Sequence, residues 1–499
     1  MIWAMNALND GRAAVAARYL RFPRAAANVA IADSYAVHPW ELESLITLLL
    51  TTRKDNTSKK DCKIRTLNCS IFETGASLVN SLRSVEDAEY SLFSSREGVF
   101  AEMHRIAQRQ FAWQRGHFNT IDFYRYSYVY GQDECAEFFR KKYDIELNDF
   151  SAVGAALYIM FRDMPELPSS VLLSLIGISP EQTEKALLLL SRDIGLARLE
   201  ASSLVQETEK KYGRMPIAYL PSVLRRFPII SFGEFRKNMI SPLPELIAQR
   251  VTSGLYYDIV AGSDNLRNVA AARFEKYCRN ILQSCLGGLQ VSESYKYRYK
   301  KNQIDSPDLF LSSNRVIAVI ECKARRLSVG ARFAGNPFEQ AEREYEEIVK
   351  GIFQLWRFFS HERRGIAGNG NYEEDVIGIV ITLDSWLQMS RELVAEVLES
   401  ARARSKAEDP LILPVDQRPI VVCSIEELER TLLSSDENTF VETIKAAVTA
   451  EYAGWLLYSV HTGIHQDIQI SRPFPFALAE VLPWKEKIDR LAKLDEETS

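Results

Sequence analysis

Two apolar runs of the sequence, residues 308–311 and 316–322, lie close enough along the chain to pair directly with each other. The short segment 312–315 between them has the length of a hairpin turn, so the pattern predicts two adjacent antiparallel strands. Asp308 begins the first run, and Glu321 lies near the far end of the second. A hairpin therefore brings two acids together at its open end, within strands that are otherwise apolar.

The register of this hairpin follows from the position of the turn. A two-residue loop at 314–315 pairs Ser313 with Val316, and a four-residue loop with the same centre leaves the outer register unchanged. Extending the pairing outward sets Asp308 opposite Glu321. Because side chains alternate between the two faces of a strand, two sets are expected. One face carries Asp308, Phe310, Val319, Glu321 and Lys323, and the other carries Leu309, Leu311, Val316, Ala318, Ile320 and Cys322.

Opposed carboxylates need a counter-charge. Residues that face each other across a strand pair have Cβ atoms about 5 Å apart, and two carboxylates at that distance raise each other's pKa. A divalent cation between Asp308 and Glu321 removes this repulsion, and ligation by oxygen alone suits Mg²⁺, with Mn²⁺ as a substitute. Lys323 on the same face can orient a water or a phosphate oxygen. The alternative is a structural salt bridge between Lys323 and one acid.

The chain around this hairpin alternates between helical and β-like runs. The expected order is a helix over about 265–285, strands at 289–299, 308–311 and 316–322, a helix over 337–361, a strand at 376–383, a helix near 389–404, a strand at 419–425 and a helix from Glu426. This order predicts an α/β sandwich with a mixed central sheet, in a domain spanning residues 251–435. A C-terminal helix and tail are expected over 436–499.

Residues 1–250 are predicted to be mostly helical, with room for two subdomains. Apolar residues at three- and four-residue spacing predict helices at 38–50, 98–114, 149–164 and 179–193. The segment 169–190 is similar to a helix-turn-helix, but its second half carries two glutamates and a single lysine. An ordinary pair of packed helices is therefore the preferred interpretation. Specificity, activation or assembly, as a homo-oligomer or with a partner subunit, is the expected role of this region.

The composition limits the classes of partner and cofactor. A net charge of −5 gives no global attraction to nucleic acid, so any phosphate-binding surface must be a local patch. The seven cysteines form no CxxC pair, which disfavours structural zinc and a disulfide framework. His461 and His465 lack a third ligand and are interpreted as surface residues. The longest uncharged apolar stretch, 152–161, is too short to cross a bilayer, so a cytoplasmic protein without membrane association is predicted.

The sequence Pro307-Asp308, followed after a spacer by Glu321-Cys322-Lys323, resembles the PD-(D/E)xK nuclease superfamily, which has the restriction-endonuclease-like fold. The resemblance implies that Asp308, Glu321 and the backbone carbonyl of Cys322 bind Mg²⁺. It also implies that Lys323 positions the attacking water and helps to deprotonate it.

The resemblance, which extends over about residues 255–430, implies two further site residues. An acid on the helix before the first strand often joins the metal site, and Glu275 matches it; a solvated helix glutamate is the alternative. Some branches carry a glutamine-x-x-x-aromatic signature on the helix after the lysine. Gln354 and Phe358 match that signature, and Gln340 is a second candidate. For Gln354, a buried amide that satisfies backbone groups is the alternative.

A basic segment, YKYRYKK at residues 295–301, alternates tyrosine with lysine or arginine. As a strand it sets the basic side chains on one side, where they can hold phosphates. The expected nucleic-acid-binding residues are Lys296, Arg298, Lys300, Lys301 and Arg325. The alternative is an edge strand with its tyrosines buried and its lysines in solvent.

The resemblance implies a Mg²⁺-dependent endodeoxyribonuclease that hydrolyses phosphodiester bonds of DNA and leaves a 5′-phosphate and a 3′-hydroxyl; RNA is not excluded as a substrate. Nucleases with large helical extensions resemble effectors of restriction or anti-phage defence systems, and a DNA-repair nuclease is the alternative. Two non-enzymatic alternatives are a nucleic-acid-binding protein with a catalytically silent nuclease fold, and an assembly protein that uses this fold for docking.

Overall fold

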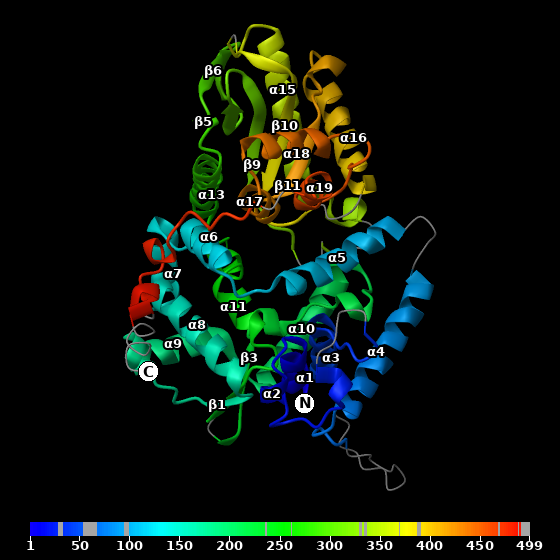
Figure 1. The fold of residues 1–499 in the computed structure, drawn as a ribbon, viewed down its shortest axis with the longest axis vertical. Coiled ribbons are helices and arrows are strands. Elements are labelled where there is room, and N and C mark those ends of the chain that lie inside the picture. The colour runs from blue at the N-terminus through cyan, green and yellow to red at the C-terminus, as the bar shows by residue number, and fades with distance from the viewer. Residues whose placement is uncertain are drawn as a thin grey trace. The chain divides into compact units, whose positions relative to one another are not determined.

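The chain divides into two compact units, seen in the computed structural model of Figure 1. The structure describes residues 1–499 except 28–32, 53–66, 94–98, 235–236, 261, 329–331, 334–336, 369, 387–390, 468–469, 488 and 491–499. Unit 1 comprises Met1–Ser94, Arg109–Leu266 and Ala477–Ser499, and unit 2 comprises Ser95–Gln108 and Arg267–Phe476. Unit 2 thus includes helices after residue 436, which the sequence had assigned to a separate C-terminal segment.

Unit 1 is mostly helical, as its apolar periodicity predicts. Its helices are α1 (Ile2–Asn9), α2 (Ala13–Ala16), α3 (Pro39–Thr51), α4 (Phe72–Phe93), the end of α5 (Val99–Arg115), α6 (Thr120–Tyr130), α7 (Asp133–Tyr143), α8 (Leu147–Asp163), α9 (Pro180–Leu190), α10 (Ile194–Tyr212), α11 (Glu245–Val251) and α12 (Leu255–Val260). A small sheet has the strand order β1-β4-β3-β2. Its strands are β1 (Glu166–Pro168), β2 (Ser191–Asp193), β3 (Ile229–Phe232) and β4 (Asn238–Ile240).

The helix-turn-helix-like hairpin predicted near 169–190 is wrong. Its second half is α9, which is capped by the Ser179 side chain, but its first half holds only the 3-10 turn Ser174–Ile176. The reason lies in the burial pattern: Val171 and Leu173 are buried, whereas the intervening Leu172 is 73% exposed. Alternation of this kind matches an extended chain rather than a helical stripe.

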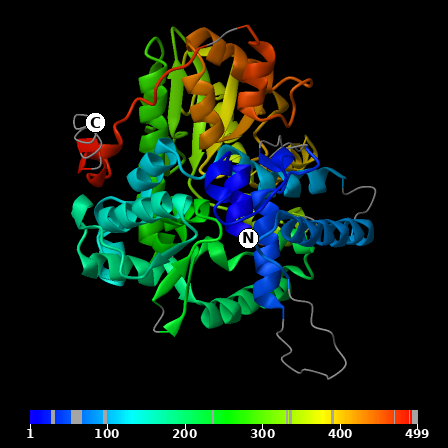
Figure 2. The same ribbon diagram turned by 60° about the horizontal axis from the view of Figure 1, so that its bottom comes forward.

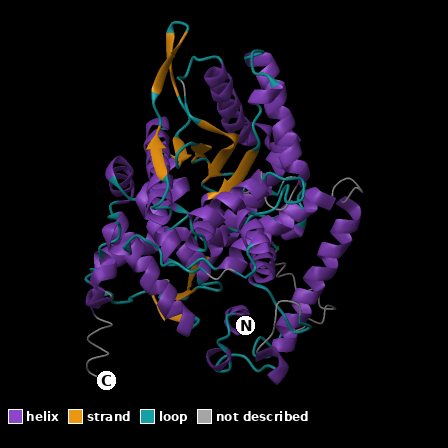
Figure 3. Cartoon of the chain, turned by 45° about the horizontal axis from the view of Figure 1, so that its top comes forward, coloured by secondary structure: helices purple, strands orange, loops and turns teal. Residues whose placement is uncertain are grey.

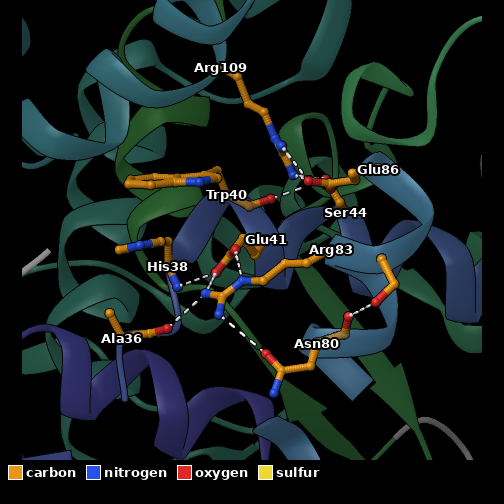
Figure 4. A network of polar contacts seen from close by, with 10 residues as sticks. Ala36, His38, Trp40, Glu41, Ser44, Asn80, Arg83, Glu86 and Arg109 are labelled. Atoms are coloured by element: carbon orange, nitrogen blue, oxygen red, sulfur yellow. Dashed lines mark hydrogen bonds and ion pairs between the residues drawn. The ribbon is translucent and has the colours of Figure 1, made fainter. Parts of the chain in front are cut away.

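Ionic side chains, of which Glu41 is buried and the others are partly exposed, join α3 to α4 and α4 to α5 within unit 1 (Figure 4). Glu41 caps the start of α3 by accepting the His38 N–H at 2.9 Å. Arg83 of α4 donates to the two Glu41 carboxylate oxygens at 2.6 and 2.8 Å. Arg109 of α5 donates to Glu86 of α4 at 2.7 Å. Each charge is therefore paired, so none of these groups is left as an uncompensated charge in the interior.

The core of unit 2 is the mixed five-stranded sheet that the order of elements predicts. Its strands are β5 (Gln290–Glu293), β8 (Leu309–Ser312), β9 (Val316–Lys323), β10 (Tyr372–Thr382) and β11 (Ile420–Ser424). They follow the order β11-β10-β9-β8-β5, shown in orange in Figure 3. β9, β10 and β11 run parallel, whereas β8 is antiparallel to both β9 and β5.

Helices cover both faces of this sheet, which makes unit 2 an α/β sandwich (Figure 2). On one face, α15 (Pro337–Arg363) packs against Phe310 and Val319, and α16 (Arg391–Glu408) packs against α15. On the other face, Cys278 of α13 (Asp264–Cys285) contacts the Cys322 thiol. α17 (Ile425–Leu433) joins α13 there, because Tyr277 donates to Glu429 at 2.5 Å. The general α/β class is thus confirmed.

The β8–β9 hairpin keeps the predicted register at its open end and departs from it at the turn. Leu311 pairs with Ala318 as predicted, but Ser312 pairs with Val316 because β9 contains one extra residue at this point. The predicted pairing of Ser313 with Val316 is therefore wrong. Such a bulge reverses the side chains beyond it, and Val316 packs on the α15 face instead of the opposite one.

The single strand predicted over 289–299 is wrong, because the chain leaves the sheet after β5. It forms a separate two-stranded ribbon from β6 (Lys296–Tyr299) and β7 (Asn302–Asp305), which we call the β6–β7 ribbon (Figures 1 and 3). The base of the ribbon is closed by Tyr295 and Ser306: the Tyr295 N–H donates to the Ser306 hydroxyl, and the Ser306 N–H donates to the Tyr295 carbonyl, both at 2.8 Å.

Two helices, α18 (Glu437–Ala447) and α19 (Leu457–Ile464), complete unit 2. The interpretation of His461 as a surface residue is wrong, since only 3% of it is exposed. Its imidazole contacts the Ser434 carbonyl at 2.9 Å and the Thr443 hydroxyl at 3.0 Å, so it holds α17, α18 and α19 together. In the part of the chain that the structure describes, no helix has the length and apolar character needed to cross a membrane.

The β6–β7 ribbon is anchored by a buried histidine of α15, and this anchor should depend on pH. His361 Nδ1 lies 2.9 Å from the Tyr297 hydroxyl, and its ring lies 4.4 Å from that of Tyr299. Burial lowers the pKa of His361 to about 4, although Asp409 opposes the shift. The unfolded chain therefore takes up a proton before the folded chain does as the pH falls.

We expect the contribution of His361 to the stability of unit 2 to be complete above about pH 6.5 and to fall by about 1–3 kcal/mol as the pH decreases toward 4. His361→Gln, which cannot titrate, should show a smaller loss over this range. Hydrogen exchange of the β6 and β7 amides at pH 7.5 and pH 5 measures the difference. An equal pH dependence in both proteins would remove His361 as the anchor.

Candidate active site

The open end of the β8–β9 hairpin brings two carboxyl groups together. Leu309 pairs with Ile320, so Asp308 and Glu321 come next on their strands. Asp308 Oδ2 accepts the Cys322 N–H at 2.7 Å, which fixes the Asp308 side chain against β9. The carboxyl groups of Asp308 and Glu321 are in hydrogen-bonding contact. The juxtaposition of acids expected from the hairpin register is therefore present in the structure.

Glu321 is the most deeply buried group of this set. Only 3% of the residue is exposed. Burial raises the pKa of Glu321 to about 8; the Lys323 ammonium opposes this shift, and the Asp308 carboxyl adds to it. A carboxyl group with this pKa resists ionisation near neutral pH. Burial is therefore the main reason that Glu321 favours its neutral form, and the nearby Lys323 ammonium only partly offsets it.

Lys323 lies between two acceptor oxygens. Its Nζ is 3.1 Å from Glu321 Oε2 and 2.9 Å from Gln354 Oε1. Burial disfavours the charged amine, but the Glu321 and Asp308 carboxyl groups outweigh burial and raise the pKa of Lys323. An ammonium group has three N–H donors. Two of them are directed at Glu321 and Gln354, which leaves one for a further acceptor.

Gln354 reaches the site from α15, as the glutamine-x-x-x-aromatic signature leads one to expect. It binds a side chain rather than a backbone group, which is contrary to the alternative interpretation. Phe358, one turn later, lies in the core, where its ring is 5.5 Å from that of Phe310. The side chain of Gln340, the second candidate, lies outside the described residues.

Glu275 approaches the same carboxyl pair from α13. Burial raises the pKa of Glu275 to about 7, and the carboxyl groups of Asp308 and Glu293 add to the shift. Glu275 is half-buried and lies near enough to Asp308 to be influenced by its charge, so it is not a fully solvated helix residue. Asp308, Glu321, Lys323, Gln354 and Glu275 therefore converge on one region, from β9, α15, α13 and the residue preceding β8.

The predicted metal ligands Asp308, Glu321 and Glu275, all of which the structure describes, do not form a three-carboxylate cluster. Among the described residues, no group of three or more histidine, cysteine, aspartate or glutamate side chains has the geometry of a metal site. Mg²⁺ commonly takes one or two carboxylates and completes its octahedron with water and substrate phosphate. Asp308 and Glu321 supply such a pair. The backbone N–H of Cys322 donates a hydrogen bond to Asp308. The group of Cys322 that was predicted to bind the metal ion is its backbone carbonyl.

The predicted nucleic-acid-binding residues lie on two elements. Lys296, Arg298, Lys300 and Lys301 are exposed on the β6–β7 ribbon, while Tyr297 on its opposite side is buried. Lys296 Nζ lies 3.8 Å from an Asp305 carboxylate oxygen. Arg325, which follows β9, donates to Glu347 at 3.0 Å. The ribbon therefore has a basic face that is open to solvent.

One structural requirement of the site was missed from the sequence. Gly351 lies one helical turn before Gln354, and a Cβ added to it would come within 3.0 Å of Lys323 Cε. The absence of a side chain at Gly351 thus lets the lysine stem pass α15 and reach Gln354. A glycine three residues before the glutamine, on the same helix face, is the signal that could have revealed it.

Comparisons with models of protein families, with curated proteins and with solved structures find no match for this chain. Its function is therefore argued from the geometry of the site.

The buried carboxyl group of Glu321 should reduce stability, and removing it should restore stability. Glu321→Gln keeps the shape of the side chain but removes a carboxyl group that is costly to bury ionised. We expect a gain of about 1 kcal/mol in the free energy of unfolding at pH 7.5, after allowing for the lost Lys323 ion pair. The gain should shrink at pH 5, where the folded protein holds Glu321 protonated.

Thermal unfolding without divalent cations measures this gain. The matched control is Glu373→Gln, which removes a partly exposed carboxylate 3.1 Å from Lys445 in the same unit and should change stability little. A loss of stability in Glu321→Gln larger than that in the control would contradict the prediction.

Proposed function

We propose that unit 2 is a restriction-endonuclease-like domain of the PD-(D/E)xK superfamily and that it hydrolyses phosphodiester bonds of DNA with Mg²⁺. The observation that carries the proposal is the contact between Asp308 and Glu321, with Lys323 held 3.1 Å from Glu321. A buried acid, Glu321, in contact with the half-buried Asp308 is unfavourable for stability, and such pairs are typical of sites that bind a cation. The sheet order with an antiparallel β8–β9 pair also supports this fold.

The proposed mechanism assigns a task to each side chain. Asp308 and Glu321 would hold the metal ion, which would supply an activated water and charge stabilisation at the phosphate. Lys323 uses its remaining N–H donor to orient the attacking water or a phosphate oxygen. Gln354 fixes the direction of the ammonium group through its 2.9 Å bond. Glu275 supplies further negative charge beside Asp308.

The bonds around Lys323 favour one of its two suggested roles. Both neighbouring acceptors stabilise the ammonium form, so Lys323 acts in this proposal as a charged donor rather than as the base that removes the proton from water. The structural salt-bridge alternative accounts for Lys323 and Glu321 alone. It does not account for the second carboxyl, Asp308, in contact with Glu321.

Substrate binding is assigned to the β6–β7 ribbon. Exposed lysine and arginine side chains on one side of a two-stranded ribbon can contact phosphates without reading the base sequence. DNA is the proposed substrate, cleaved internally to leave a 5′-phosphate, and a restriction or anti-phage defence system is the proposed setting. Unit 1 is proposed to supply specificity, activation or assembly contacts.

Replacing the site residues should abolish cleavage. We expect the variants Asp308→Asn, Glu321→Gln and Lys323→Met to lower the rate of Mg²⁺-dependent cleavage of plasmid DNA by at least about 10²-fold, because each removes a charge needed at the reacting phosphate. Gln354→Leu should have a smaller effect, because Gln354 acts through Lys323. Gel assays with Mg²⁺ and with EDTA measure the rates.

Lys445→Met is the matched control for Lys323→Met, since Lys445 lies in the same unit and pairs with Glu373 and Asp375. It should cleave at the wild-type rate. Wild-type cleavage by Glu321→Gln and Lys323→Met would exclude these residues from the mechanism. Salt-sensitive binding that survives Asp308→Asn, with no cleavage by the wild-type protein, would identify a catalytically silent nuclease fold.

Neutralising the ribbon should weaken binding without impairing the chemical step. We expect the double variant Arg298→Gln/Lys300→Gln to bind duplex DNA more weakly and to reduce the salt slope, d log K/d log[salt], by roughly 1–2 in magnitude. Cleavage at saturating DNA should remain near the wild-type rate. Fluorescence anisotropy across a salt series measures the slope, and an unchanged slope would assign the phosphate contacts to another surface.

A further inference from the structure

A small polar cavity lies at the carboxyl ends of β10 and β11, within unit 2. Its volume is about 10 Å³, which is about the minimum needed to hold one water-sized group. Residues from several elements line it, among them Thr382, Trp386, Ser424, Glu427 and Trp455. The cavity therefore combines hydroxyl groups, a carboxylate and two indole rings.

The cavity lies close to the proposed active site. Lys323 pairs with Thr382 across β9 and β10, and Thr382 pairs with Ser424 across β10 and β11. Neighbouring strands are about 4.8 Å apart, so the Cα atoms of Lys323 and Ser424 are separated by about 10 Å. The indole of Trp386 also donates to the Arg325 carbonyl at 3.1 Å, which ties the cavity wall to the segment after Lys323.

Glu427, which lines this cavity, has one carboxylate oxygen that is unpaired within the described part of the chain. The residue is 2% exposed, and its Oε2 accepts the Tyr458 N–H at 3.2 Å. Its Oε1 is buried and has no hydrogen-bond partner among the described residues. A buried acceptor without a donor costs about 1–3 kcal/mol. Such an oxygen beside a cavity of this size marks a place for one compact N–H or O–H donor.

Trp455 offers a flat aromatic surface at the same cavity. It is 56% exposed, and the ring of Tyr452 meets it edge-on at a centroid distance of 5.6 Å. An exposed tryptophan is costly to leave in water and is a common platform for unpaired nucleobases, which stack on it with about 1–3 kcal/mol per base.

We infer that this cavity is a recognition subsite for one unpaired nucleobase that carries an exocyclic amino group. The base stacks on Trp455, and its amino group enters the cavity and donates to Glu427 Oε1. Cytosine and adenine carry such a group where thymine carries an oxygen, and glutamate is a known acceptor for the cytosine amino group. The inference rests on the proposed nuclease function, and it specifies a substrate with a single-stranded nucleotide next to the cleaved bond.

Binding of homopolymers tests the subsite without cleavage. The probes are fluorescent deoxycytidine and deoxythymidine oligomers of equal length, bound to the full chain in EDTA. We expect the wild-type protein to bind the deoxycytidine oligomer several-fold more tightly than the deoxythymidine oligomer. Glu427→Met should reduce this ratio to about one, and Glu427→Gln, which keeps a neutral acceptor, should give an intermediate ratio.

The stacking contribution has its own variants. Trp455→Ala should weaken binding of both oligomers by about 5- to 100-fold, and Trp455→Phe should recover part of the loss. Tyr257→Ala, which removes an aromatic residue that is 47% exposed in unit 1, is the matched control and should bind as the wild type does.

The outcomes separate this inference from the proposed function. Unchanged affinities in Trp455→Ala, or an unchanged base preference in Glu427→Met, would overturn the subsite even if Mg²⁺-dependent cleavage is observed. Conversely, Trp455-dependent binding with no cleavage would support the subsite and reject the nuclease activity.

Discussion

The contact between Asp308 and Glu321 is the interaction on which the proposed chemistry depends. It exists because a short antiparallel hairpin brings the ends of β8 and β9 together, and the sandwich around the hairpin excludes water from Glu321. Hydrophobic packing of Phe310 and Val319 against α15 maintains this arrangement. The stability of the core thus offsets an unfavourable pair of acids, as is common where a site has been selected for function.

The sequence predicted the features that follow from periodicity and short range. Alternation along 308–323 fixed the outer hairpin register, because a shift of one residue would have moved the apolar side chains to the wrong faces. Gln354 was predicted only through the glutamine-x-x-x-aromatic signature of the resembled family, and the structure places it 2.9 Å from Lys323 Nζ. Glu275 was harder to assign, because a helix glutamate beside an apolar stripe has the same local pattern whether it faces solvent or a site.

The features that sequence reasoning missed depend on tertiary contacts. The expected strand pattern is interrupted by the extra residue in β9 and by the segment that forms the β6–β7 ribbon. No glycine or proline marks either position in the sequence. Leu172 and its neighbours resembled a helix because several apolar residues cluster there, yet their exposure alternates. His461 was misjudged because its hydrogen-bond partners come from α18 and from the end of α17, which a linear sequence does not bring together.

The extra residue in β9 also has an evolutionary consequence. It divides the hairpin into a tip near Ser312 and an outer part that carries the acids, and each part has its own pairing. Insertions, deletions or substitutions at the tip can be accommodated at this discontinuity before they shift the strand ends. The sequence of the tip can therefore change, while the spacing between the Asp308 and Glu321 carboxylates is kept.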